Sequence, residues 1–246
     1  MRTTGALVAD LLARVRAAAA VGVTLLELDG VARDVIDRAG AVSSFLGYQP
    51  WPGLMPYPAV ICSSVNDVAL HGIPDAYVLR EGDLLSVDCA VALDGWTADS
   101  AVSFAVGAAD PADTRLIETA ERALAAGIAA LVDGGRLGDV SAAIGAVGRG
   151  AGYGMNTDFG GHGIGRQMHQ EPSVPNDGKA RRGPKLRPGV VLAVEPWFSA
   201  GGSADITVDA DGWTLRSADG SRAAHVEHTV AVTPDGPRIL TLPATG

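Results

Sequence analysis

The chain has 246 residues, of which 47% are hydrophobic and 19% charged, a balance typical of a folded protein with a sizeable core. Its formal net charge of -9 repels a phosphate backbone, so we expect no specific nucleic acid ligand. With two cysteines outside any CxxC, no apolar run of about 18 residues and no secretory leader, the sequence favours a cytoplasmic protein without a membrane span.

The N-terminal part of the sequence predicts two helices. Hydrophobic residues recur at helical spacing from Leu7 to Val15. A second helix is expected to begin at Thr24, because Thr24 and Glu27 form a capping-box pattern, and to end at Gly40.

A proline-rich segment and a hairpin follow. Residues 47–58 contain four prolines among aromatic residues, which predicts an ordered loop with aromatic side chains available for a pocket. Two apolar runs, 84–93 and 96–106, flank Asp94-Gly95. This pattern is a strong signal for a β-hairpin.

The second half of the sequence predicts two more helices. Pro111 is expected to open a helix that Gly134 stops, and a weaker pattern predicts another helix around 140–147. Asp211-Gly212 indicates a further hairpin turn. Strands are also expected in four ranges: 59–62, 190–198, 204–209 and 223–232.

An internal echo links the two halves of the chain. The pattern of residues 79–88 reappears 107 residues later at 186–195, and each copy has a glycine turn, an apolar strand and a final carboxylate. Two helices also precede the strands in each half. We therefore interpret the chain as a duplicated α+β unit, with chance similarity as the alternative. We expect one catalytic domain over 1–246, with halves of about 1–107 and 108–246.

The predicted hairpin brings two acids together. A two-residue turn at 94–95 sets Asp99 opposite Ala90, and Asp88 lies two residues from Ala90 on the same side of the sheet. Diagonal neighbours of this kind are about 7 to 8 Å apart, so their carboxylates could reach one cation or a pair of cations.

Other candidate ligands occur later in the chain. Glu195 and Glu227 lie among apolar strand residues, where a carboxylate is costly to bury unless it is protonated, paired or bound to a metal. His162 lies in a glycine-rich run that allows close approach to its ring. Taken singly, each acid also fits a solvated strand edge, and His162 fits a structural histidine. Together, four carboxylates and one imidazole suit manganese, iron or cobalt at least as well as zinc.

These residues resemble the signature of a known family. In their order and spacing, the five candidate ligands are similar to those of methionine aminopeptidases, which have the pita-bread fold: Asp88, Asp99, His162, Glu195 and Glu227. The resemblance extends from about residue 60 to residue 232 and includes the segment 65–74. It implies an α+β fold with a pseudo-two-fold duplicated unit, in which helices cover a curved antiparallel sheet.

The resemblance also implies an activity. The enzyme would hydrolyse the N-terminal methionine from nascent proteins and peptides with a small second residue, using a water activated by two divalent ions of cobalt, manganese, iron or zinc. Asp88 would chelate one ion, Asp99 and Glu227 would bridge the two, and His162 and Glu195 would complete the shells. Glu195 is also the family's candidate for transferring a proton from the water to the leaving amine.

Further roles are carried over by position. His71 would lie near the scissile amide and the new amino terminus, and His169 would hydrogen-bond the substrate carbonyl oxygen. Four residues are similar to those that line the methionine pocket: Tyr48, Cys62, Phe159 and Trp213. Trp51 or Tyr57 is a candidate addition. Without the resemblance, both histidines would be ordinary loop residues, and the aromatic residues would be core packing.

The partners follow from the same resemblance. We expect a monomer that acts on nascent polypeptide N-termini. The residues Lys179 to Arg187 form a basic loop on an acidic protein, which is either simply solvated or makes a transient contact with the ribosome. Two rival functions remain open: a proline-directed relative such as aminopeptidase P or prolidase, and a module that has lost catalysis and only binds protein or RNA.

Overall fold

A long antiparallel hairpin crosses the centre of the computed structural model, which describes residues 1–243. It consists of β4 (Leu84–Leu93) and β5 (Trp96–Ala105), joined at Asp94-Gly95, where both residues have positive φ. The predicted register is confirmed, because Ala90 pairs with Asp99. Two short strands, β1 (Val42–Ser43) and β2 (Cys62–Val65), pair with the other edge of β4.

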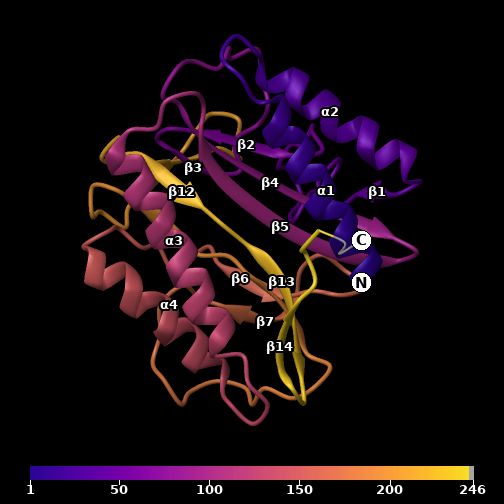
Figure 1. Cartoon of the computed structure of the whole chain (residues 1–246), viewed down its shortest axis with the longest axis vertical. Helices are drawn as coiled ribbons and strands as arrows, with labels where there is room; N and C mark the ends of the chain where they lie inside the picture. Colours follow the sequence, from indigo (N-terminus) through magenta and orange to yellow (C-terminus); the bar gives the residue numbers. More distant parts are fainter. Residues whose placement is uncertain (244–246) are drawn as a thin grey trace.

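Two helices cover this hairpin. They are α1 (Arg2–Ala18) and α2 (Leu25–Arg38), and Figure 1 shows both in indigo on one side of the molecule. The predicted capping box at the start of α2 is confirmed, since Glu27 N–H donates to the Thr24 hydroxyl and Thr24 N–H donates to the Glu27 carboxylate. Apolar side chains of α1, α2, β4 and β5 form one core.

A second sheet and helix pair form the other half. The helices are α3 (Pro111–Ala129) and α4 (Leu137–Ala151). The sheet has the order β14-β13-β8-β6-β7, with every neighbouring pair antiparallel. Its strands are β6 (Gly161–Gly163), β7 (Gln170–Val174), β8 (Val191–Val194), β13 (His228–Thr233) and β14 (Gly236–Ile239). Apolar side chains of α3, α4, β8 and β13 form the second core.

Smaller strand groups complete the structure. One antiparallel group joins β10 (Ile206–Val208), β11 (Leu215–Ser217) and β3 (Val68–Leu70). The other pairs β9 (Trp197–Ser199) with β12 (Ala223–His225). Within residues 1–243, no helix combines the length and the hydropathy that crossing a bilayer requires.

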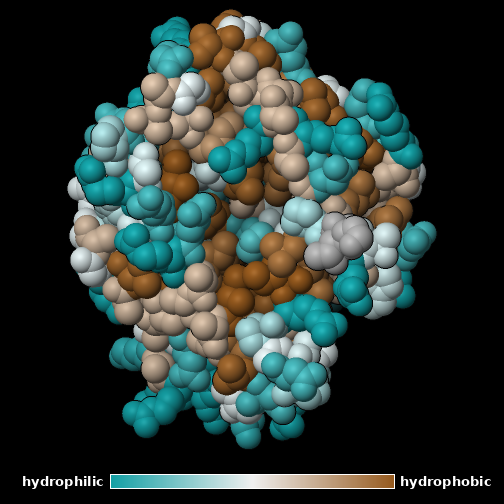
Figure 2. Space-filling view, in the orientation of Figure 1, coloured by the Kyte–Doolittle hydropathy of each residue, from teal (hydrophilic) through white to brown (hydrophobic). Residues whose placement is uncertain are grey.

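The two halves meet along β5 and the β12–β13 segment. The Thr229 hydroxyl donates to Asp99 O at 2.7 Å and accepts from Asp99 N–H at 2.9 Å, and Glu227 N–H donates to Ala101 O at 3.0 Å. Figure 1 shows these strands side by side between the two helix pairs. Figure 2 shows hydrophilic side chains around most of the rim of this face and hydrophobic ones gathered toward its middle. The seam therefore fixes residues of both halves in one register.

Several predicted elements differ in extent. The strand expected at 59–62 begins only at Cys62, because the N–H groups of Val60 and Ile61 donate to the Asp29 carboxylate instead of to a neighbouring strand. The strand expected at 190–198 is divided after β8, at Glu195-Pro196, and the strand at 223–232 is divided between β12 and β13. The hairpin turn at 211–212 lies within a longer connection between β10 and β11.

Candidate active site

All of the site residues selected from the sequence line one pocket of about 780 Å³. The metal-ligand candidates come from five separate segments: Asp88 on β4, Asp99 on β5, His162 on β6, Glu195 just after β8 and Glu227 between β12 and β13. Glu195 and Pro196 follow the last residue of β8. The hydrogen bond between Asp99 and Thr229 aligns β5 with β13. The interruptions that divide the expected strands therefore occur where carboxylates enter the pocket.

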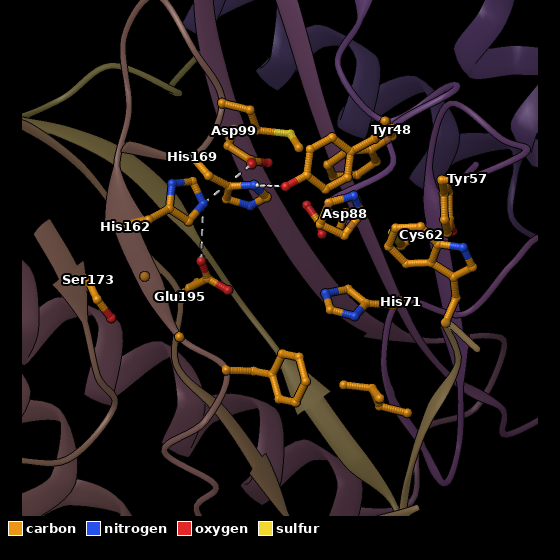
Figure 3. Close-up of a pocket in the computed structure, with 18 of the residues that line it drawn as sticks. Tyr48, Tyr57, Cys62, His71, Asp88, Asp99, His162, His169, Ser173 and Glu195 are labelled. Atoms are coloured by element: carbon orange, nitrogen blue, oxygen red, sulfur yellow. Dashed lines mark hydrogen bonds and ion pairs between the residues drawn. The ribbon is translucent and has the colours of Figure 1, made fainter. Parts of the chain in front are cut away.

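The candidate ligands lie close together. His162 Nε2 is 3.5 Å from Glu195 Oε1 and 4.0 Å from Asp99 Oδ2 (Figure 3). Asp99, His162 and Glu227 each offer one ligand atom, and these three atoms lie within 4.8 Å of one another. Such spacing suits donors that converge on a common cation.

Burial makes ionisation of these four carboxyl groups unfavourable. Asp99 is 4% exposed and Glu227 is 2% exposed. Burial raises the pKa of Asp99 to about 7. Burial, together with the charge of Asp99, raises the pKa of Glu195 to about 8 and that of Glu227 well above its usual range. The same causes raise the pKa of Asp88, so the group favours either protons or bound cations.

Unpaired oxygens give independent support for a cation site. Among the described residues, one carboxylate oxygen of each of three acids is buried without a hydrogen-bond partner: Asp88 Oδ1, Asp99 Oδ1 and Glu227 Oε1. An unpaired buried carboxylate oxygen is costly, and metal coordination removes that cost. An oxygen-rich donor set with one imidazole fits divalent transition metals.

Two further histidines border this cluster. His71 follows β3 with a positive φ of 58°, an uncommon conformation that turns its side chain into the pocket. Its ring centroid is 5.7 Å from that of Phe159, and burial lowers its pKa to about 4. His169 lies 4.3 Å from His162 between ring centroids, and its Nδ1 is 2.8 Å from the Tyr48 hydroxyl (Figure 3).

An apolar recess adjoins the histidines. Its walls belong to one hydrophobic cluster, which also contains the buried Ala59 and Ala90. The members that line the pocket include Phe45, Tyr48, Tyr57, Cys62, Met168 and Trp213. Phe159 lines the same pocket but packs in a different cluster, with Trp197 and Leu215. Of the six expected pocket residues, four belong to this cluster, whereas Trp51 and Phe159 line the pocket outside it.

Sequence reasoning missed three residues here. Phe45 and Met168 line the pocket. Phe45 lies in no recognisable motif, and the only signal for Met168 is its position next to His169. His225 is buried, and its Nε2 lies 3.8 Å from Glu195 Oε2 without a hydrogen-bond partner among the described residues. Its offset of two residues from Glu227 was the available signal, because such residues share one side of a strand.

Comparisons with known proteins give relatives in both sequence and structure. The sequence pattern of metallopeptidase family M24 matches residues 1–234. A methionine aminopeptidase 1 of Mycobacterium tuberculosis is 52% identical, covering 98% of this chain and 91% of the relative. The crystal structure of a methionine aminopeptidase from Thermotoga maritima superposes with a TM-score of 0.93 at 35% identity, covering 98% of this chain and 95% of that one. A prolidase from Pyrococcus horikoshii shares the fold, with a TM-score of 0.77 at 16% identity, covering 99% of this chain and 61% of that one.

Proposed function

This chain belongs to metallopeptidase family M24, and from that premise we propose that it removes the N-terminal methionine from peptides and nascent proteins whose second residue is small. The predicted pita-bread fold and the predicted resemblance to methionine aminopeptidases are confirmed by the structural and curated relatives. The observation that supports the proposed activity best is the convergence of four carboxylates and one imidazole beside an apolar recess.

The donor set fits two divalent ions. Five side chains would hold them: Asp88, Asp99, His162, Glu195 and Glu227. Asp99 and Glu227 are the least exposed of these carboxylates and would be among the residues that hold the ions. When bound, such ions lower the pKa of a water molecule and polarise a carbonyl group. Cobalt, manganese, iron and zinc are all compatible with the donors.

Side chains of the protein would transfer the proton and hold the substrate. Glu195 would accept a proton from the attacking water and pass it to the leaving amine, because its carboxylate faces the pocket beside His162. His169 would donate a hydrogen bond to the carbonyl oxygen of the scissile peptide. His71 would contact the scissile amide and the new amino terminus. All three residues line the same pocket.

The apolar recess would bind the methionine side chain. Tyr48, Cys62 and Trp213 enclose it together with Phe45 and Met168. An unbranched thioether fits such a recess through dispersion and sulfur–aromatic contacts. Phe159, which lies beside His71, would border the substrate near the scissile bond rather than the methionine side chain.

Peptide hydrolysis tests this proposal. We expect Met-Ala-Ser to be cleaved faster than Met-Leu-Ser and faster than any Xaa-Pro peptide in a metal-supplemented assay. Glu195→Gln should lower kcat by about 10²- to 10⁴-fold, because proton transfer is lost while the side-chain volume is kept. His71→Ala should also lower turnover, with circular dichroism as the control for folding. Faster cleavage of an Xaa-Pro peptide would instead favour the hypothesis of a proline-directed peptidase.

The setting of the reaction is also part of the proposal. We expect a cytoplasmic monomer that meets nascent chains at the ribosome. Its exposed basic loop contains Lys179, Arg181, Arg182, Lys185 and Arg187, a charge pattern that suits a phosphate-rich surface. Reversing these charges should reduce co-sedimentation with ribosomes while leaving tripeptide cleavage intact. Equal co-sedimentation of both forms would exclude this contact.

A further inference from the structure

The tip of the central hairpin contacts the loop that carries His169. Residues 164–169 connect β6 to β7, and the Arg166 guanidinium carbon lies 3.9 Å from the centroid of the Trp96 ring. Arg166 Nη1 also donates to Gly95 O at 3.1 Å, and Thr97 N–H donates to Gly165 O at 2.8 Å. Two segments far apart in the sequence are therefore joined at one point.

The local sequence is suited to this contact. Gly95 has a positive φ of 72°, and a Cβ at this position would lie 2.9 Å from Arg166 Nη1. A glycine therefore serves both the turn and the close approach of the guanidinium. Trp96 is 38% exposed, so its ring is available as a stacking surface on the outside of the hairpin. A guanidinium above an indole face is the most favourable cation–π arrangement.

The contact connects two parts of the candidate active site. The hairpin strand that begins at Trp96 continues to Asp99, and the loop that contains Arg166 continues to His169. On the pocket side, the Tyr48 hydroxyl lies 2.8 Å from His169 Nδ1. His169 is thus held at its ring by Tyr48, and the arginine three residues earlier is stacked on the tip of the hairpin.

We propose that Trp96 and Arg166 form a positioning pair, which holds the 164–169 loop against the metal-bearing hairpin and so fixes His169 at the scissile carbonyl. Neither residue of the pair lines the pocket. The inference rests on the proposed function, in which His169 hydrogen-bonds the carbonyl oxygen. Small displacements of such a donor lower the rate strongly, because its contribution depends on alignment in the transition state.

Steady-state kinetics on Met-Ala-Ser test the pair. Trp96→Ala and Arg166→Ala should each lower kcat about tenfold, with KM changed less than about twofold. The double variant should be no slower than Arg166→Ala, because that variant already lacks both the stacking on Trp96 and the hydrogen bond to Gly95 O. Trp96→Phe should restore most of kcat, since it keeps an aromatic face. Arg80→Ala is the matched control, because it removes an exposed arginine stacked at 5.5 Å over Tyr77 and should leave kcat unchanged.

Carbon-13 NMR of the five histidines separates this inference from the proposed function. Trp96→Ala should shift the His169 ring signal, assigned by His169→Gln, and leave that of His228 unchanged. This result tests the contact even if the wild-type enzyme cleaves no methionyl peptide. The inference is overturned if the His169 signal stays in place, if kcat of both single variants equals that of wild type, or if the two losses multiply in the double variant.

Discussion

The direction of the hydrogen bond between Tyr48 and His169 sets which nitrogen of His169 carries the proton. Burial raises the pKa of the Tyr48 phenol, so its hydroxyl stays protonated at neutral pH. A neutral imidazole has one donor and one acceptor nitrogen. When the hydroxyl donates to Nδ1 at 2.8 Å, the proton of the ring resides on Nε2. That tautomer is the one able to donate a hydrogen bond to a substrate carbonyl.

Tyr48→Phe should therefore lower kcat by about two- to tenfold, the range expected for one net hydrogen bond. KM for Met-Ala-Ser should change little, because the ring that packs against Trp213 remains. Tyr77→Phe is the matched control, since it removes a hydroxyl bonded to Asp83 outside the main pocket. An unchanged kcat for Tyr48→Phe would mean that the ring of His169 is oriented by other contacts.

At the level of the element, local signals predicted the structure well. The hairpin was predictable because its turn residues and its apolar runs act over neighbouring positions, so that the register of Asp99 against Ala90 followed from Asp94-Gly95 alone. The start of α2 was predictable for the same reason, because Thr24 and Glu27 are three residues apart.

Elements shaped by distant contacts could not be predicted. Asp29 binds the N–H groups of Val60 and Ile61 across about thirty residues, and it delays β2 until Cys62. The sequence around Phe45 likewise contains nothing that assigns it to a recess completed by Met168. Such pairings become visible only when the chain is folded, because the interacting residues share no local pattern.

The candidate site itself was largely predictable. The order and spacing of four acids and His162 gave five ligand candidates, and these line a common pocket. Their separations and their unpaired oxygens required the coordinates. His225 illustrates the limit, because its importance depends on a 3.8 Å approach to Glu195 across separate strands.

At the scale of the whole molecule, the site depends on both halves. Asp88 and Asp99 precede residue 107, whereas His162, Glu195 and Glu227 follow it. We propose that the chain is one catalytic domain with halves of about 1–107 and 108–246. Each half has its own hydrophobic core, and hydrogen bonds such as that from Thr229 to Asp99 O join the two halves. Neither half alone would contain the donor set.

Ionisation of the site should also affect global stability. Folding raises the pKa of Asp99 to about 7 and that of Glu195 to about 8, so these carboxyls stabilise the metal-free protein at low pH and lose that contribution as pH rises through 7 to 8. Buried histidines act oppositely, because folding lowers their pKa to about 4 or below: His71, His162, His225 and His228. Their contribution is lost as pH falls from about 6.5 toward 4.

Between about pH 7.5 and 8.5 the carboxyls still change protonation, whereas the histidines are neutral in both the folded and the unfolded chain. The metal-free protein should accordingly lose on the order of 1 kcal/mol of unfolding free energy over this interval. Urea denaturation after chelator treatment measures the loss. Saturating manganese should abolish it, because cations replace the protons on Asp99 and Glu195. A metal-free protein whose stability stays level or increases from pH 7.5 to 8.5 would show that these carboxyls are ionised without a bound cation.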